Sequence, residues 1–166
     1  MSLENFQIPI VLIPELYKDS LVQLEAEQAT SINLKESRLT FTGSNLKNIL
    51  ILTEDAHHLH LADTDLEFLA NILNACKLNL NDVAIVNLFH NKGADFILLS
   101  SQFKPENILL FGVIGASIGI QHHSDNYELT KWQNINIISG DHLSAIATQP
   151  ELKKKLWLQL KKLFQI

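Results

Sequence analysis

Four segments of the chain carry the apolar residues that a buried β-strand requires. Three of them, 47–53, 83–88 and 107–111, contain near-continuous apolar runs. The fourth, 134–138, alternates between polar and apolar residues before it becomes apolar. Near-continuous apolar runs are typical of strands that are covered on both faces, as in parallel sheets. We therefore predict four core strands.

Segments with the spacing of apolar helix faces separate these strands. The first is predicted over 65–77, with Thr64 and Glu67 as a capping box. A second helix is predicted over 94–103, and the glycines that follow Gly112 predict a turn into a short helix of small residues. The chain therefore alternates between strands and helices.

The last helix follows a loop of small and polar residues, predicted over 139–148. Thr148 and Glu151 stand at capping-box spacing, and Pro150 falls in the first turn, where its missing N–H does no harm. Leucines at helical spacing predict the face that packs on the core: Leu152, Leu156, Leu160 and Leu163.

Alternation of strands and helices predicts a parallel sheet with right-handed crossovers and helices on both faces. We expect a three-layer α/β/α fold around a central, mainly parallel, four-stranded sheet. This α/β core is predicted over 47–166, in a single domain overall. It is preceded over 1–46 by an arm and short irregular elements, which include a short strand over 39–42. The polar segment 121–133 is predicted to be irregular.

The start of the chain is β-branched and apolar, but prolines interrupt it. Pro9 and Pro14 make a central strand unsuitable and favour an edge strand or an extended arm. A short helix is predicted after it, within 14–28. An apolar arm of this kind suits docking on a protein partner. The residues expected to make that contact are Gln7, Ile8, Ile10, Leu12 and Tyr17.

Composition and charge exclude several classes of protein. With 166 residues, 46% of them apolar, the chain is long enough to bury a core, and its formal net charge is −5. One cysteine, Cys76, rules out an internal disulfide and a cysteine-built zinc or iron–sulfur site. No basic leader and no apolar run of membrane-spanning length is visible, so we expect a cytoplasmic protein without membrane contact.

Two local clusters have two interpretations each. The lysines of the last helix form either a solvated face, which is favoured, or a patch for weak contact with DNA phosphates or an acidic partner. The histidines of 57–60, like the pair at 122–123, are either surface residues, which is favoured, or zinc ligands. We predict no metal or other cofactor. The lysines concerned are Lys153, Lys154, Lys161 and Lys162.

Several segments resemble the bacterial uracil-DNA glycosylase superfamily. Residues 47–91 are similar to its amino-terminal half, with a helix that ends Leu-Ala-Asn-Ile-Leu-Asn-Ala-Cys-Lys-Leu and a strand Asn-Asp-Val-Ala-Ile-Val-Asn. Residues 104–119 resemble its third strand and glycine-rich turn, and residues 142–164 resemble its last loop and helix. The resemblance implies the fold of that superfamily.

The resemblance also implies three site residues. Glu54 corresponds to a water-positioning carboxylate, Asn87 to the asparagine that reads the uracil edge, and His142 to the histidine of the last loop. The family's Gly-Glu-Ala-Pro-Gly type of loop, however, reads Thr-Glu-Asp-Ala-His here. Leu61 stands where the aromatic residue that stacks on the base is expected, although Phe89 is an alternative stacking group.

Loss of the rigid glycine and proline positions favours a retained fold over a retained enzyme. The psi subunits of the bacterial DNA polymerase III clamp loader are non-enzymatic relatives. The amino-terminal arm, Gln149-Pro150 and Leu156-Trp157 resemble features of that family. We therefore expect a non-catalytic binding module in DNA replication or repair, in which Glu54, Asn87 and His142 are vestigial. The alternative is a divergent uracil-DNA glycosylase that uses these three residues.

Overall fold

The structure is a computed structural model that describes residues 38–121 and 125–166. The predicted arm at Gln7–Tyr17, the predicted helix within 14–28, and His122 and His123 lie outside the described residues. Residues 39–166 form one compact unit.

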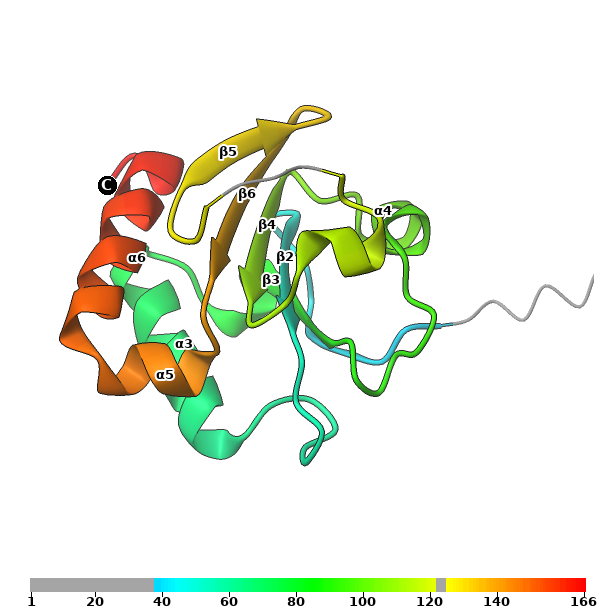
Figure 1. The fold of residues 1–166 in the computed structure, drawn as a ribbon, viewed down its shortest axis with the longest axis horizontal. Helices are drawn as coiled ribbons and strands as arrows, with labels where there is room; N and C mark the ends of the chain where they lie inside the picture. Colours follow the sequence, from blue (N-terminus) through cyan, green and yellow to red (C-terminus); the bar gives the residue numbers. More distant parts are fainter. Residues whose placement is uncertain (1–37, 122–124) are drawn as a thin grey trace, which may run out of the picture. The chain divides into compact units, whose positions relative to one another are not determined.

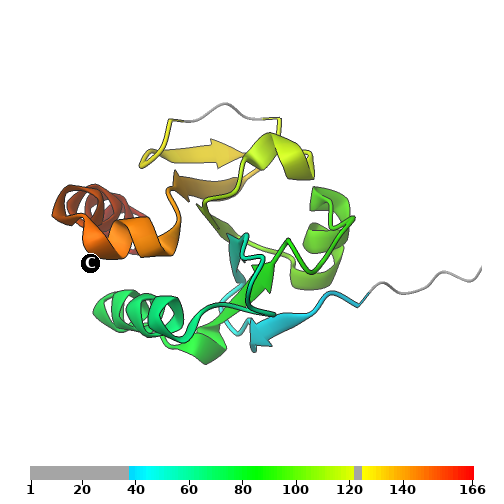
Figure 2. The same ribbon diagram turned by 60° about the horizontal axis from the view of Figure 1, so that its bottom comes forward.

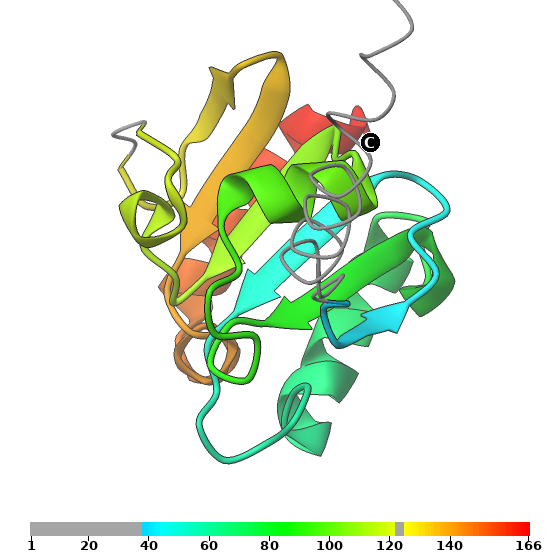
Figure 3. The same cartoon turned by 90° about the vertical axis from the view of Figure 1, so that its right-hand side faces the viewer.

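A single mixed sheet organises the described part of the chain (Figure 1). Its strands stand in the order β1-β3-β2-β4-β6-β5. The four inner strands, β3, β2, β4 and β6, run parallel, whereas β1 and β5 pair antiparallel at the two edges (Figure 3). The strand bounds are β1 Phe41–Gly43, β2 Ile49–Thr53, β3 Val83–Asn87, β4 Asn107–Phe111, β5 Leu129–Trp132 and β6 Ile135–Gly140.

The four predicted core strands are confirmed as the parallel centre of the sheet, but the predicted number of strands in the sheet was wrong. Six strands are present in the described residues. Strand β1 has only three residues, and it overlaps the short strand predicted over 39–42, within the segment 1–46. Strand β5 lies within the predicted irregular segment 121–133 and pairs with β6 across Gln133 and Asn134. Both of these turn residues have positive φ, as in the tight turns that suit a hairpin.

Helices cover both faces of the sheet (Figure 2). Helices α3, α5 and α6 pack on the face that carries Ile49 and Ile51. Helix α4 and the 3-10 turn η3 pack on the opposite face, which carries Leu50 and Leu52. The alternation follows from the strand geometry, in which successive side chains point to opposite faces. The helical bounds are α3 Asp63–Ala75, η2 Leu80–Asp82, α4 Phe96–Phe103, η3 Gly115–Ile118, α5 Leu143–Thr148 and α6 Pro150–Phe164.

This arrangement is a mixed α/β fold, and it is compatible with the predicted three-layer architecture. Every residue of β2 and β3 is buried, as the near-continuous apolar runs predicted. No helix in 38–121 or 125–166 combines the length and apolar character needed to cross a membrane.

Both predicted capping boxes were wrong. Helix α3 begins at Asp63, so that Ala62 stands at the N-cap and makes no side-chain cap. Thr148 belongs to helix α5, which forms where a loop was predicted, and its hydroxyl donates to the carbonyls of Ser144 and Ala145. Pro150 does occupy the first turn of α6, as predicted.

Candidate functional site

The carboxyl ends of the parallel strands meet at one edge of the sheet, where α/β proteins commonly bind ligands. Glu54 directly follows β2, Asn87 is the last residue of β3, and His142 stands two residues after β6. The topology therefore places all three predicted site residues at this edge. Their environments, however, are very different.

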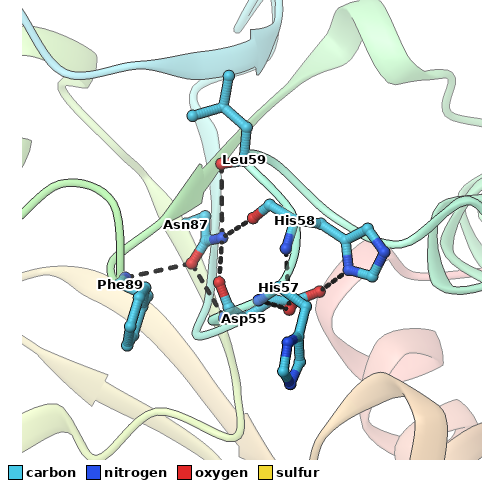
Figure 4. A network of polar contacts seen from close by, with 6 residues as sticks. All are labelled: Asp55, His57, His58, Leu59, Asn87 and Phe89. Carbon is cyan, nitrogen blue, oxygen red and sulfur yellow. Dashed lines mark hydrogen bonds and ion pairs between the residues drawn. The ribbon is translucent and has the colours of Figure 1, made fainter.

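Asn87 is fully buried, and its carboxamide binds only backbone groups (Figure 4). Its oxygen accepts the N–H groups of Asp55 at 3.0 Å and of Phe89 at 3.1 Å. Its nitrogen donates to the carbonyls of Asp55 at 2.8 Å and of His58 at 2.7 Å, with a longer contact of 3.4 Å to the carbonyl of Leu59. Asn87 therefore anchors the loop after β2, and these bonds occupy both ends of its carboxamide.

A second asparagine, which the sequence did not single out, continues this network. Asn91 is buried and donates to the backbone carbonyls of Asn87 at 2.8 Å and of Thr40 at 3.0 Å. Its oxygen accepts the N–H of Thr40 at 2.7 Å. Asn91 thus joins the end of β3 to the residue just before β1.

Glu54 and His142 line one pocket, of about 350 Å³, between the carboxyl edge and the amino ends of α3 and α5. Both side chains are exposed. Asn87 is not among the residues that line the pocket. These are Thr53, Glu54, Asp55, Ala56, His57, His58, Leu61, Asp65, Phe111, His142, Leu143 and Ser144.

The imidazole of His142 lies directly against the backbone of Gly112. A side-chain carbon at position 112 would collide with the ring, and Gly112 also has φ of +68°, a conformation that favours glycine. The N–H of Gly112 donates to the carbonyl of Gly140 at 2.9 Å, which joins the ends of β4 and β6. Glycine at 112 therefore leaves room for the histidine at the pocket wall.

Asp55 is a pocket carboxylate that forms hydrogen bonds within its own loop. It accepts the backbone N–H groups of His57 at 2.8 Å and of His58 at 3.3 Å, and it contacts the His58 ring nitrogen Nδ1 at 2.8 Å. Burial alone would raise the pKa of Asp55, but these hydrogen bonds stabilise the carboxylate and hold its pKa below the ordinary value.

Asp65, in the first turn of α3, is in the opposite situation. Burial raises the pKa of Asp65, the nearby Asp55 charge raises it further, and His58 and His142 only partly offset these effects. Within the described residues, the side chains of Glu54 and Asp65 make no hydrogen bond or ion pair. Two carboxylates of this pocket thus have no hydrogen-bond or ion-pair partner in residues 38–121 and 125–166.

Thr53 adds a buried polar atom to the same pocket. Its side chain is only 3% exposed, and its hydroxyl has no hydrogen-bond partner. The residue ends β2 on the face shared with Ile49 and Ile51, which is the face that α3 and α5 cover. An orphaned buried hydroxyl is uncommon in a folded protein and calls for an explanation.

The remaining residues that the sequence singled out lie partly in the pocket lining and partly outside it. Leu61 lines the pocket, whereas Phe89 lies outside its lining and contacts the ring of His90 edge-on. His58 is paired with Asp55, and the ring nitrogen Nδ1 of His60 is buried without a partner. Over residues 38–121 and 125–166, no three His, Cys, Asp or Glu side chains are placed to hold a metal ion.

The sequence was compared with models of known protein families and with curated proteins. It matches neither a family model nor a curated protein.

Proposed function

We propose that this protein is a non-catalytic member of the uracil-DNA-glycosylase-like fold and acts as a protein-binding module in DNA replication or repair. Within that class, the psi subunits of the polymerase III clamp loader are the nearest in character. The proposal rests on the sequence resemblance, and a mostly parallel sheet with helices on both faces is compatible with it.

The burial and the hydrogen bonds of Asn87 are the main support for a non-catalytic role. A glycosylase reads the flipped base through hydrogen bonds to its edge, so the reading side chain needs free donors and acceptors that face the pocket. The carboxamide of Asn87 is fully buried, is bonded to backbone groups, and is absent from the pocket lining. The residue that corresponds to the edge reader is used here to hold a loop.

The charge of the pocket supports the same proposal. Lysine and arginine residues supply most of the affinity of proteins for nucleic acid, because they neutralise phosphates. Among the described residues, those that line this pocket include three carboxylates and no lysine or arginine. A negatively charged pocket repels the backbone that a glycosylase must bring to its active site.

A cluster of five of the thirteen lysine and arginine residues lies elsewhere, on helix α6. Lys154 and Lys162 are exposed, as a solvated helix face or an acidic-partner patch both require. Lys153 stands over the ring of Phe68 at 5.5 Å, and Lys161 stands over the ring of Trp157 at 5.8 Å. These contacts are within the range of cation–π attraction. We propose this helix and the Gln7–Tyr17 arm as the partner-binding segments.

Direct binding tests the proposal. The full chain is mixed with the purified clamp-loader proteins of its own organism, including the chi subunit, and affinity is measured by calorimetry. We expect binding that weakens at least about tenfold when residues 7–17 are deleted, since docking segments concentrate affinity in a few anchors. The control is a chain in which the same eleven positions, 7–17, are scrambled, which keeps composition and length. A folded full chain that binds none of these proteins contradicts the proposal, as does equal binding by the deletion variant.

The second candidate is a divergent glycosylase, and one observation favours it. Glu54 and His142 line the same pocket, although they lie far apart in the sequence. A carboxylate that positions water and a histidine that stabilises developing charge are suitable groups for cleaving a glycosidic bond. Release of uracil from DNA distinguishes the two candidates.

A further inference from the structure

The pocket at the carboxyl edge carries acidic groups from two elements. Glu54 and Asp55 come from the loop after β2, and Asp65 comes from the first turn of α3. Among the described residues, the other ionisable groups that line it are the imidazoles of His57, His58 and His142. With neutral histidines, this pocket has a charge of −3 and no permanent cation, so it attracts positively charged groups.

Two of these carboxylates are available to a ligand. Asp55 is already bonded to His57 and His58, whereas Glu54 and Asp65 have no hydrogen-bond or ion-pair partner among the described residues. The raised pKa of Asp65 reflects burial and the neighbouring Asp55 charge. A bound cation would offset both causes of this shift, because an opposite charge nearby favours the ionised carboxylate.

The hydroxyl of Thr53 is an independent sign that a polar ligand fits here. It belongs to a residue that lines the same pocket where β2 ends, and it is buried with no hydrogen-bond partner among the described residues. A hydroxyl oxygen accepts hydrogen bonds as well as donating one, so it is able to take an N–H from a cationic group. The carboxylates and this hydroxyl together offer acceptors on more than one side of the pocket.

The residues that line the pocket suit some kinds of cation better than others. No three potential ligand residues within 38–121 or 125–166 are placed to hold a metal ion, which removes support for a divalent cation. The rings of Phe111 and His142 also line the pocket. A guanidinium is planar, carries five N–H donors, pairs with carboxylates and stacks on rings, whereas an ammonium is a compact charge that prefers water.

We propose that this pocket accepts the guanidinium group of an arginine side chain that a partner protein inserts. That the arginine belongs to a protein rests on the proposed function as a binding module. The pocket itself can be tested without that partner.

Exposed apolar side chains at the same edge of the sheet indicate which residues of the partner would lie beside its arginine. Leu59, Phe89 and Ile114 are 56%, 39% and 75% exposed. They stand in the loops after β2, β3 and β4, three neighbouring parallel strands, so all three belong to this edge of the sheet. An anchor pocket with an apolar surround is typical of a protein-binding surface. A partner segment with apolar residues beside its arginine fits this surface.

The test is a titration of the isotopically labelled full chain, followed by NMR. The probe is the peptide acetyl-Leu-Arg-Leu-amide. Its control is the same peptide with citrulline, which has the shape of arginine without the charge. Agmatine serves as a free guanidine, and magnesium chloride serves as a metal. We expect saturable shifts at residues 53–65 and 142–144, and a Kd for the arginine peptide at least about tenfold below that for the citrulline peptide.

Two pairs of variants locate the site. Asp65→Asn should weaken binding of the arginine peptide about tenfold, whereas Asp63→Asn, at an exposed position of the same helical turn outside the pocket lining, should change it less than about twofold. Thr53→Val should also weaken binding, while Thr64→Val on the exposed start of α3 should not. Binding should also weaken in acid, first as Asp65, whose pKa is raised, loses its charge, and then as Asp55, whose pKa is lowered, does so.

Several results overturn the proposal. They are equal affinity for the arginine and citrulline peptides, an equal effect of Asp63→Asn and Asp65→Asn, and saturable shifts of the same residues with magnesium. Agmatine binding more tightly than the peptide would also overturn it, because the pocket would then serve a free guanidine. Since the assay contains no partner protein, its result is separate from that of the clamp-loader measurement.

Discussion

Two regions of the same sheet edge use the same kinds of polar side chain in opposite ways. Asn87 is fully buried and gives its hydrogen bonds to the backbone of the neighbouring loop. In the adjacent pocket, Glu54 and Asp65 have no hydrogen-bond or ion-pair partner within the described part of the chain, and the hydroxyl of Thr53 is buried and unpaired there. Position at a strand end therefore does not assign a role to a polar side chain. The partners of each polar atom separate groups that support the fold from unpaired groups, which are the candidates for contact with a ligand.

The largest effect is expected from Asn87→Ala. The change removes a fully buried carboxamide and leaves part-buried backbone groups of Asp55, His58 and Phe89 without these bonds, so we expect the free energy of unfolding to fall by about 3 kcal/mol. Urea unfolding measures it as a lower midpoint with an unchanged slope. The control is Asn74→Ala on the exposed side of α3, which should change stability by less than about 0.5 kcal/mol. A loss below about 1 kcal/mol for Asn87→Ala would show that the loop does not depend on this anchor.

Gly112→Ala tests the contact between the His142 ring and the backbone of Gly112 at the pocket wall. We expect a loss of about 2 kcal/mol, because alanine adds both a collision with His142 and the strain of positive φ. Gly93→Ala is the matched control, since Gly93 has φ of +85° with nothing near its absent side chain, and it should lose only about 1 kcal/mol. Adding His142→Ala to Gly112→Ala should recover the difference. If it recovers nothing, the ring does not lie against Gly112.

Asp55→Asn should destabilise the protein at neutral pH by about 1 kcal/mol, the scale of a lost charge-assisted hydrogen bond. Because the folded-state pKa of Asp55 is lowered, its stabilisation is present above the carboxyl pKa of the unfolded chain. It is lost as the pH falls through the lower folded-state pKa. Unfolding curves from pH 7 to pH 3 should therefore show the native chain and the variant converging in acid. A constant difference across that range would contradict the assigned role.

Asp65→Asn should act with the opposite sign and the smallest magnitude. A raised folded-state pKa means that the charged form costs stability above that pKa, and that the cost disappears below the unfolded-state pKa. We expect a gain of about 0.3 kcal/mol at neutral pH that vanishes in acid. Asp63→Asn should instead lose about 0.3 kcal/mol, because it removes a charge that favours the helix start. Thermal unfolding of the three chains side by side measures these differences, and a loss for Asp65→Asn would show that its charge is not disfavoured.

The centre of the sheet was predictable, because strands covered on both faces need near-continuous apolar residues. Of the two edges, β1 overlaps the short strand predicted over 39–42, whereas β5 was missed. Strand β5 carries polar residues, so it depends on its neighbour rather than on its own pattern. Helix α5 has six residues and no strong apolar period, and it was therefore predicted as a loop.

The site was predictable in place but not in function. Parallel topology brings Glu54, Asn87 and His142 to one edge, as expected from their positions after strands. The role of Asn87 depends on which backbone groups lie next to its side chain. The amino-acid sequence alone does not reveal those neighbours. The burial of Asp65 was also missed, since an acidic residue in a first helical turn is ordinary.

The most direct test of the central claim is an assay of uracil release from single-stranded and duplex DNA by the full-length protein. Glu54→Ala and His142→Ala are run beside it, with circular dichroism to verify folding. We predict no release above that of buffer, because Asn87 is committed to the loop and the pocket is acidic. Release that falls sharply in both variants would contradict this account and establish a divergent glycosylase.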